Sequence, residues 1–175
     1  MLKLYKKCYL FFNYIEFSYQ KKNHDDKEEK ENVDFAAILT GREEVPEVDT
    51  LDTALATFQS NKKDDNKEKN DLKFSVKTTD MSKIKEVHIY TGKASEKGDV
   101  VADLYKSETP SGEVIMDNIS EGKIKSKDLK GPLEGKSTQE LVRKMEKGEA
   151  YVDISTADKP KGKVRGRIKK LAPPS

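Results

Sequence analysis

The sequence predicts an all-β fold, an antiparallel Greek-key β-sandwich with one inserted helix. Short runs in which apolar and polar residues alternate recur from Asp34 to Asn118 and again from Tyr151 to Ile168, with Gly, Pro and charged residues between them. A single segment, Ser137–Lys147, has the signals of a substantial helix. Many short strands separated by turns, with few helices, are typical of antiparallel sandwiches.

The composition suits one modest core with solvated segments around it. Of the 175 residues, 34% are hydrophobic and 38% are charged, which favours one domain. The net charge of +2 argues neither for nor against nucleic acid as a partner. Cys8 is the one cysteine, so no intrachain disulfide can form, and zinc sites with two or more thiolates are excluded.

Residues 1–33 are expected to precede the domain as an N-terminal segment. Met1–Gln20 starts with lysines and continues with aromatic and apolar residues, as an export signal does, but Asn13 and Glu16 interrupt the run and no small-residue cleavage site follows. We expect this segment to be removed or to anchor the protein to a membrane. An extracytoplasmic or membrane-associated location is therefore predicted, while a misassigned start and a cytoplasmic location stay open. Lys21–Asn32 is a charged linker.

Six strands are expected in the first part of the domain. The clearest is in DLKFSVKT, where Leu72, Phe74 and Val76 face one way and lysines face the other. A second clear strand, EVHIYTG, places His88 and Tyr90 on the face opposite its apolar residues. The loop Asn61–Asn70 is too charged to be buried. The predicted strands are Asp34–Thr40, Ala54–Gln59, Asp71–Thr78, Glu86–Gly92, Val100–Tyr105 and Glu113–Asn118.

The predicted helix has start and stop signals of its own. Ser137 and Glu140 have the spacing of a capping box, in which each satisfies a free donor at the helix start. Gly148 stands where a helix commonly ends. Leu141 and Met145 are four residues apart, so both are expected to pack on the sheet.

A β-hairpin is expected at the end of the domain, in YVDISTADKPKGKVRGRI. Its alternation directs Asp153, Ser155 and Arg165 away from the core. A hairpin with one apolar face is not stable alone in water, so earlier strands must cover that face. The core-facing residues are expected to be Val152, Ile154, Val164 and Ile168.

Three segments in this order resemble the CHRD domain, the module named after chordin. They are FAAILTGREEVPEV, EVHIYTGKASEKGDVVADLY and GEAYVDISTADKPKGKVRGRI, with the predicted helix between the last two. The resemblance covers residues 34–170 and leaves 171–175 as a tail. It implies an immunoglobulin-like or superoxide-dismutase-like β-sandwich, found in microbial proteins of which many are exported, and no settled biochemical activity.

The sequence departs from the family where metal chemistry would be expected. The family typically has His-x-His in the second segment and another histidine in the third. Here His88 is present, but Tyr90 and Ser155 occupy the other two positions, and His24 lies in the linker. Since zinc or copper needs three or four converging donors, we expect no metal and no other cofactor.

Polar residues from three segments form a candidate polar cluster. In a functional interpretation it is a pocket left where a metal or ligand site once was; in the favoured structural interpretation it is an ion-paired patch that holds the edge of the sandwich. Arg165 is the expected anchor, partly buried and paired with Glu44 or Asp153, because its planar guanidinium suits a carboxylate. The members are Glu44, His88, Tyr90, Asp153, Ser155 and Arg165.

A basic run near the C-terminus forms a candidate anion-binding patch. It could contact anionic lipid or polysaccharide, but no aromatic residues interleave with it, which disfavours nucleic acid. A solvated strand face is the favoured interpretation. The members are Lys161, Lys163, Arg167, Lys169 and Lys170.

Three function hypotheses follow. The leading one is a non-enzymatic CHRD-domain module outside the cytoplasm, structural or binding, whose partner is another protein or an anionic surface polymer. The first alternative is a metal-binding or dismutase-like enzyme, and the second is an anion-binding surface module that uses the basic strand. The sequence contains no nucleophile elbow, phosphate loop, zinc-protease motif or calcium loop.

Overall fold

The computed structural model describes residues 33–60, 71–92, 96–110 and 114–172. By its internal contacts the chain divides into two units, Met1–Glu31 and Asn32–Ser175, and the described residues belong to the second. The predicted export signal, the charged linker and the charged loop after the second strand lie outside the described residues. The side chains of residues 80 and 114–117 are also outside this description.

The described residues form one antiparallel sheet whose strands follow the order β5-β4-β7-β8-β1-β2-β3-β6, with β9 paired to β1. The eight strands predicted by alternation are confirmed, although β3 and β6 run several residues further than expected. The two-residue β9 was not predicted, because a pair of lysines has no alternation. The strands are β1 (Phe35–Thr40), β2 (Thr53–Ser60), β3 (Leu72–Ser82), β4 (Ile84–Thr91), β5 (Asp99–Lys106), β6 (Val114–Ile124), β7 (Ala150–Thr156), β8 (Val164–Arg167) and β9 (Lys169–Lys170).

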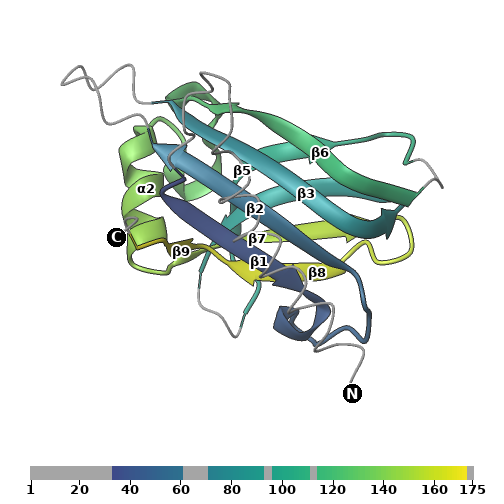
Figure 1. Cartoon of the computed structure of the whole chain (residues 1–175). Coiled ribbons are helices and arrows are strands. Elements are labelled where there is room, and N and C mark those ends of the chain that lie inside the picture. Colours follow the sequence, from purple (N-terminus) through teal and green to yellow (C-terminus); the bar gives the residue numbers. More distant parts are fainter. Residues whose placement is uncertain (1–32, 61–70, 93–95, 111–113, 173–175) are drawn as a thin grey trace, which may run out of the picture. The chain divides into compact units, whose positions relative to one another are not determined.

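The sheet curls into a nearly closed barrel. Its end strands approach each other, and the Ser120 hydroxyl of β6 donates a hydrogen bond to the Leu104 carbonyl of β5 over 2.7 Å. Figure 1 shows β1, β2, β3 and β6 on the near side, with β5 and β7 behind them. The predicted Greek-key sandwich is not confirmed, because β8 pairs with β1 at Arg165 and Thr40 and so joins the strands into one path.

The inward-facing apolar side chains of all the longer strands make one core. Phe35, Phe58 and Ile154 are almost completely buried, as the period-two alternation predicted. Phe74 is partly buried and packs against the same core. The four core residues predicted for the terminal hairpin are all buried, so the hairpin face is covered by strands from earlier in the chain.

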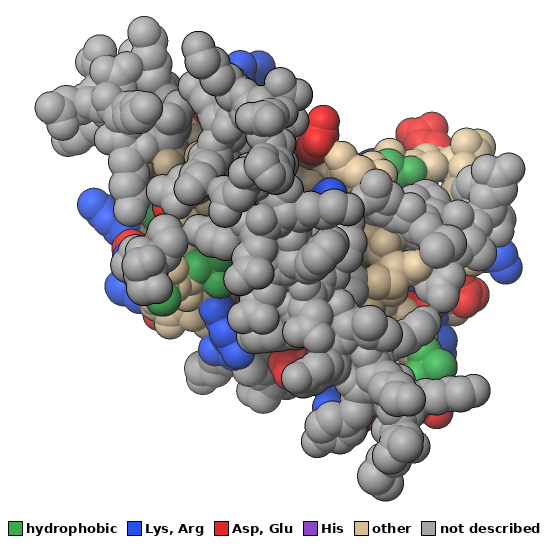
Figure 2. Space-filling view, in the orientation of Figure 1, with side chains coloured by type: hydrophobic (Ala, Val, Ile, Leu, Met, Phe, Trp, Pro, Cys, Tyr) green, Lys and Arg blue, Asp and Glu red, His purple; other side chains and the backbone are tan. Residues whose placement is uncertain are grey.

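The helix α2 (Thr138–Glu146) closes one end of this core through Leu141, Val142 and Met145. It follows the 3-10 turns η2 (Ser126–Asp128) and η3 (Gly131–Leu133). Among the described residues, no helix has both the length and the apolar character needed to cross a membrane. On the face shown in Figure 2, the visible hydrophobic side chains of described residues are small separate areas among charged ones.

The two ends of α2 test the predicted start and stop signals. Gly148, at φ 67°, ends the helix as predicted, and the next amide, of Glu149, donates to the Lys144 carbonyl over 2.9 Å, the pattern of a Schellman motif. The predicted capping box is wrong. Ser137 is the N-cap but its side chain makes no capping hydrogen bond. The Glu140 amide, which a capping box would pair with that side chain, donates to the Ser137 backbone carbonyl over 3.0 Å.

Candidate functional site

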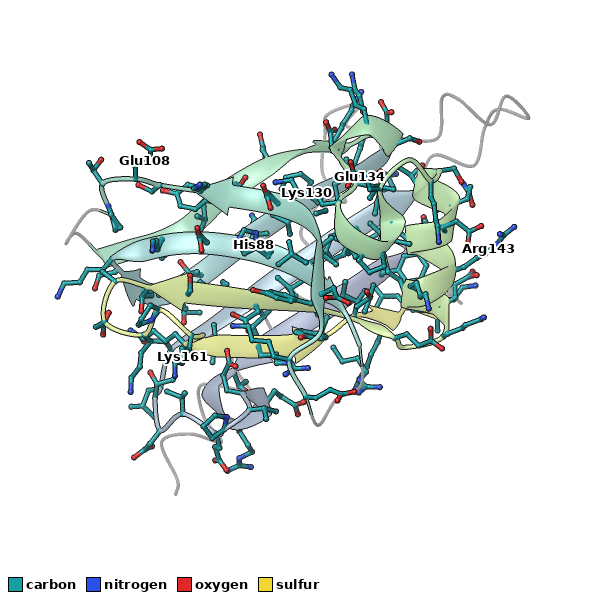
Figure 3. The ribbon with its side chains drawn as sticks, turned by 180° about the vertical axis from the view of Figure 1, so that it is seen from behind. His88, Glu108, Lys130, Glu134, Arg143 and Lys161 are labelled. Carbon is teal, nitrogen blue, oxygen red and sulfur yellow. The ribbon has the colours of Figure 1, made fainter. Side chains whose placement is uncertain are left out.

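The candidate polar cluster is built largely on the outer face of β4, β7 and β8. The strand register places His88 of β4 opposite Asp153 of β7, and Asp153 opposite Arg165 of β8. Two residues away on each strand, Tyr90 of β4 lies opposite Tyr151 of β7. Figure 3 shows His88 on the strands that face the viewer, on the side hidden in Figure 1. Alternation places these side chains on one face of their strands, and the pairing of β4, β7 and β8 brings them into neighbouring rows.

Residues 96–98, which lead into β5, fold back over this outer face. The Gly98 amide donates a hydrogen bond of 2.8 Å to the Tyr151 hydroxyl. The Arg165 guanidinium donates one of 3.1 Å to the Glu96 carbonyl. Strand β7 is consequently buried on both faces, by the core on one side and by loop residues on the other.

Two further loops complete the cover. Lys97 donates to the Lys161 carbonyl in the β7–β8 turn over 2.6 Å. Glu44, just after the 3-10 turn η1 (Gly41–Glu43), packs its carboxylate on Gly162, where a Cβ atom would lie 2.6 Å from Glu44 Oε1. Gly162 also has φ 129°, a conformation that L side chains rarely adopt. The turn and the carboxylate therefore fit only with glycine at this position.

Aromatic rings form the centre of the cluster. The rings of Tyr90 and Tyr151 stack with their centroids 5.2 Å apart and their planes within 4°. The Arg165 guanidinium lies 3.5 Å from the centroid of Tyr151, a cation–π contact that does not require a carboxylate partner. His88 meets Tyr90 edge to face at 6.0 Å. Burial raises the pKa of both tyrosines, so their hydroxyls keep their protons.

Two carboxyls in the cluster are strongly perturbed. Glu44 and Asp153 are 7% and 4% exposed. Burial, and then the charge of Asp153, raise the pKa of Glu44 to about 7, against the opposing effects of Arg165 and Lys97. Burial raises the pKa of Asp153 to about 6, although Lys97, Arg165 and His88 oppose the shift. The charge of Arg165 lowers the pKa of both carboxyls, and the pairing of Arg165 with one of them stays a prediction.

Three buried polar atoms of the cluster have no hydrogen-bond partner among the described residues: Glu44 Oε1, His88 Nδ1 and Ser155 Oγ. His88 Nδ1 lies 3.0 Å from Asp103 Oδ1, but without the alignment that a hydrogen bond requires. Burial would raise the pKa of Asp103, but its hydrogen bond to Lys130 and the charge of His88 outweigh burial and lower it.

The cleft described beside the cluster is small. Beside Tyr151, Arg165 and Arg167 there is a cleft of about 10 Å³, which is space for roughly one water molecule. The described residues contain no group of three or more His, Cys, Asp or Glu side chains placed to hold a metal ion. This geometry holds loops on a sheet and buries the perturbed carboxyls.

The candidate anion-binding patch is not one open basic surface. Lys163 pairs with Asp52 at 2.7 Å and Lys170 with Glu146 at 3.0 Å. Arg167 is partly buried and donates to the Gly148 carbonyl at the end of α2. The other two members, Lys161 and Lys169, are exposed but lie on the β7–β8 turn and on β9.

The structure adds three residues that the prediction of the cluster did not include. Tyr151 shares the strand face of Asp153, so alternation could have identified it. Asp103 lies opposite His88, but strand pairing is not visible in one sequence. Lys97 lies in the loop before β5, and no local sequence pattern predicts which part of the sheet such a loop will contact.

A comparison with protein families finds one match. The family model described as CHRD domain matches residues 35–168. No curated protein and no solved structure matches the chain.

Proposed function

Because the chain belongs to the CHRD domain family, we propose that it is a non-enzymatic binding module, acting outside the cytoplasm, whose loops recognise another macromolecule. The family supports a module whose ligand is not known. The observation that carries the proposal is the buried polar cluster. Its perturbed side chains hold three loops on the sheet, which is a structural task, and a fixed set of loops is a common basis for recognition.

The loops that the cluster holds also carry exposed apolar side chains. Val45, next to Glu44, is 43% exposed and Leu51 is 53% exposed. Leu51 precedes Asp52, which is paired with Lys163 beside the β7–β8 turn. Apolar side chains on a fixed polar surface are typical of partner-binding sites. We call the surface formed by residues 44–52, 96–98 and 157–163 the loop surface.

The two alternatives have less support. A dismutase-like metal site needs several imidazoles, and the sequence offers His88 in the domain and His24 outside it. An anion-binding strand needs lysines that are free to meet a polymer, whereas Lys163 and Lys170 already have acidic partners. Lysines that are already paired with carboxylates add little to the attraction of an anionic surface.

Export is tested by expressing the full chain in its source cells with a C-terminal tag, followed by fractionation and N-terminal sequencing. We expect the protein in an extracytoplasmic or membrane fraction, either without Met1–Gln20 or anchored by it. The reason is the basic start and the apolar run that follows it. Full-length protein confined to the soluble cytoplasm would rule out this part of the proposal.

Recognition is tested by the binding of the labelled, purified protein to the surface of the same cells. A double variant Val45→Ser and Leu51→Ser should bind several-fold more weakly. The matched control is Ile38→Ser with Leu171→Ser, because these apolar residues are 36% and 43% exposed but lie on β1 and after β9. Equal binding by both double variants would remove the loop surface from the proposal.

A further inference from the structure

Glu44 is the residue through which segment 41–52 rests on the β7–β8 turn. An added Cβ atom at Gly162 would lie within 2.9 Å of all three atoms of the Glu44 carboxyl group, so this group packs directly on the backbone of the turn. At the far end of the segment, Asp52 pairs with Lys163 at 2.7 Å. Near Val45, the contact between segment and turn is therefore made by the Glu44 carboxyl group.

The position of this carboxyl group suits the neutral acid better than the carboxylate. Glu44 is 7% exposed, and its Oε1 atom is buried without a hydrogen-bond partner among the described residues. An unpartnered oxygen in a buried site costs far more free energy when the group is charged than when it is neutral. Ionisation of Glu44 therefore opposes its contact with Gly162.

The groups around Glu44 include a second buried acid. Burial is the largest cause that raises the pKa of Glu44, and the charge of Asp153 on β7, which is 4% exposed, is the next. A hydrogen bond from the Val45 amide, Arg165 of β8 and Lys97 before β5 all lower this pKa, but it still lies at about 7. The positive charges beside Glu44 thus do not restore the ordinary acidity of the carboxyl group.

The hydroxyl groups of Tyr90 on β4 and Tyr151 on β7 also face Glu44. Burial raises the pKa of both tyrosines, so their hydroxyls keep their protons and stay uncharged. His88 of β4 acts on Asp153 and lowers the pKa of that acid. The site as a whole therefore favours a protonated Glu44 up to about pH 7.

We propose that pH switches the loop surface, because ionisation of Glu44 releases segment 41–52 from the β7–β8 turn. With the acid neutral, Glu44 holds its neighbour Val45 at the turn; with the acid charged, the carboxylate moves into solvent and Val45 moves with it. The effect on binding rests on the proposed function of the loop surface, whereas the release itself does not.

The direction and the size of the effect follow from linkage. The pKa of the docked Glu44 is about 7, against an ordinary value of 4.5 that the released segment should regain. The docked state therefore binds the proton more tightly, is favoured at low pH and loses this advantage as pH rises. The ratio of released to docked molecules should rise on the order of 200-fold from about pH 4 to about pH 8.

Amide hydrogen exchange of the full chain over this pH range tests the release, after correction for the intrinsic effect of pH on exchange. The Val48 amide, which donates to the Gly41 carbonyl, should open on the order of 200-fold more often at the upper end of the range. It should also open far more often than the amides of the core strand β2 at every pH. A flat opening ratio overturns the proposal, and so does one equal to that of β2, which would report unfolding of the whole domain.

The variant Glu44→Gln removes the titration and keeps the shape of the neutral acid. Its Val48 opening ratio should stay low and constant across the pH range. The matched control is Glu43→Gln, which removes the same charge from the adjacent exposed residue and should keep the whole rise. A rise that persists in Glu44→Gln, or one that disappears in Glu43→Gln, overturns the proposal.

Cell-surface binding at two pH values separates this inference from the proposed function. The wild type should bind several-fold more weakly at about pH 8 than at about pH 6, while Glu44→Gln should bind equally at both. Equal binding by the wild type at both pH values overturns the switch and leaves the proposed function standing. A Val48 opening ratio that rises in a protein that binds no cells at either pH supports the release and rules out the proposed function.

Discussion

Arg165 connects the aromatic centre of the polar cluster to the loop above it. Its guanidinium covers Tyr151 and donates to Glu96, while the residue is 4% exposed. Arg165→Ala should lower the free energy of unfolding by about 3 kcal/mol or more, because it removes a positive charge that acts on two buried carboxyls. Urea unfolding at fixed pH and salt measures the loss.

Arg167→Ala is the control for Arg165→Ala. Arg167 is partly buried and makes one hydrogen bond to the Gly148 carbonyl, so its loss should cost about 1 kcal/mol. Equal small losses in the two variants would show that Arg165 behaves as an ordinary surface charge.

The carboxyl of Glu44 makes stability depend on pH. Its pKa rises from 4.5 to about 7 and that of Asp153 from 3.8 to about 6, so between about pH 4 and 7 the folded protein binds more protons than the unfolded chain. The free energy of unfolding should therefore fall by several kcal/mol, about 1.4 kcal/mol for each unit by which a pKa is raised, as pH rises through this window, and be flat above it. Denaturant unfolding as a function of pH measures this slope.

Glu44→Gln isolates the contribution of this residue. Glutamine resembles the protonated acid, so the variant should match the wild type near pH 4.5 and be the more stable protein above pH 7. The pKa of Asp103 is lowered, so its contribution to the free energy of unfolding is lost as pH falls, and only at lower pH. If the free energies of unfolding of the variant and the wild type change with pH in parallel, Glu44 is not a source of the pH dependence.

Much of the cluster at the residue scale could be predicted from period-two alternation. Asp153, Ser155 and Arg165 share one strand face, and this follows from the sequence alone. Their burial does not follow, because it depends on residues 96–98 folding back from a distant connection. The partners of Lys163 and Lys170 likewise come from distant segments, so the sequence suggested a basic surface where the structure has ion pairs.

At the scale of elements, Gly166 lets β8 approach β1. A Cβ atom at Gly166 would lie 2.2 Å from the backbone oxygen of Ile38, and a backbone atom cannot move aside as a flexible side chain can. Gly166→Ala should therefore destabilise the protein by about 3 kcal/mol, as measured by urea unfolding.

Gly135→Ala provides the matched control. Gly135 has φ 70° and nothing within 4 Å of an added Cβ. The variant therefore measures the cost of the backbone conformation alone, without a steric clash, and should lower the free energy of unfolding by about 1 kcal/mol. A smaller loss at Gly166 than at Gly135 would mean that β8 can move away from β1 without penalty.

The helix shows which local signals are reliable. The glycine stop signal at Gly148 succeeded because its Schellman hydrogen bonds involve only neighbouring residues. The capping box did not form: the Glu140 amide donates to the Ser137 backbone carbonyl rather than to its hydroxyl. Ser126, from another element, accepts the first helical amide, that of Thr138, a tertiary contact that the local sequence does not reveal.

For the whole molecule, alternation identified the strands but not their neighbours. The sandwich prediction assumed two sheets, whereas the pairing of β8 with β1 makes one path. That pairing joins Thr40 to Arg165, two residues from opposite ends of the domain. It depends on glycine at position 166, because a side chain there would meet the β1 backbone. No property of either strand alone distinguishes these two arrangements.

Metal content is a property of the whole chain, and we expect the purified protein to hold no stoichiometric zinc or copper. His88 has Asp103 and Glu86 nearby, but three or four converging donors are required. Elemental analysis after dialysis, with His88→Ala as the comparison, measures this directly. One metal per chain that is lost in His88→Ala would restore the metal-binding hypothesis.

The first and last strands of the domain lie side by side. Phe35 and Ala36 of β1 pair with Lys170 and Lys169 of β9 in antiparallel register, and the Leu171 amide donates to the Asp34 carbonyl over 2.9 Å. The chain therefore enters and leaves the barrel at one point. A pulling force applied to the two ends would peel β9 from β1 one hydrogen bond at a time rather than shear them together. By the same geometry, the domain could be inserted into a surface loop of another protein without forcing the two ends of that loop apart.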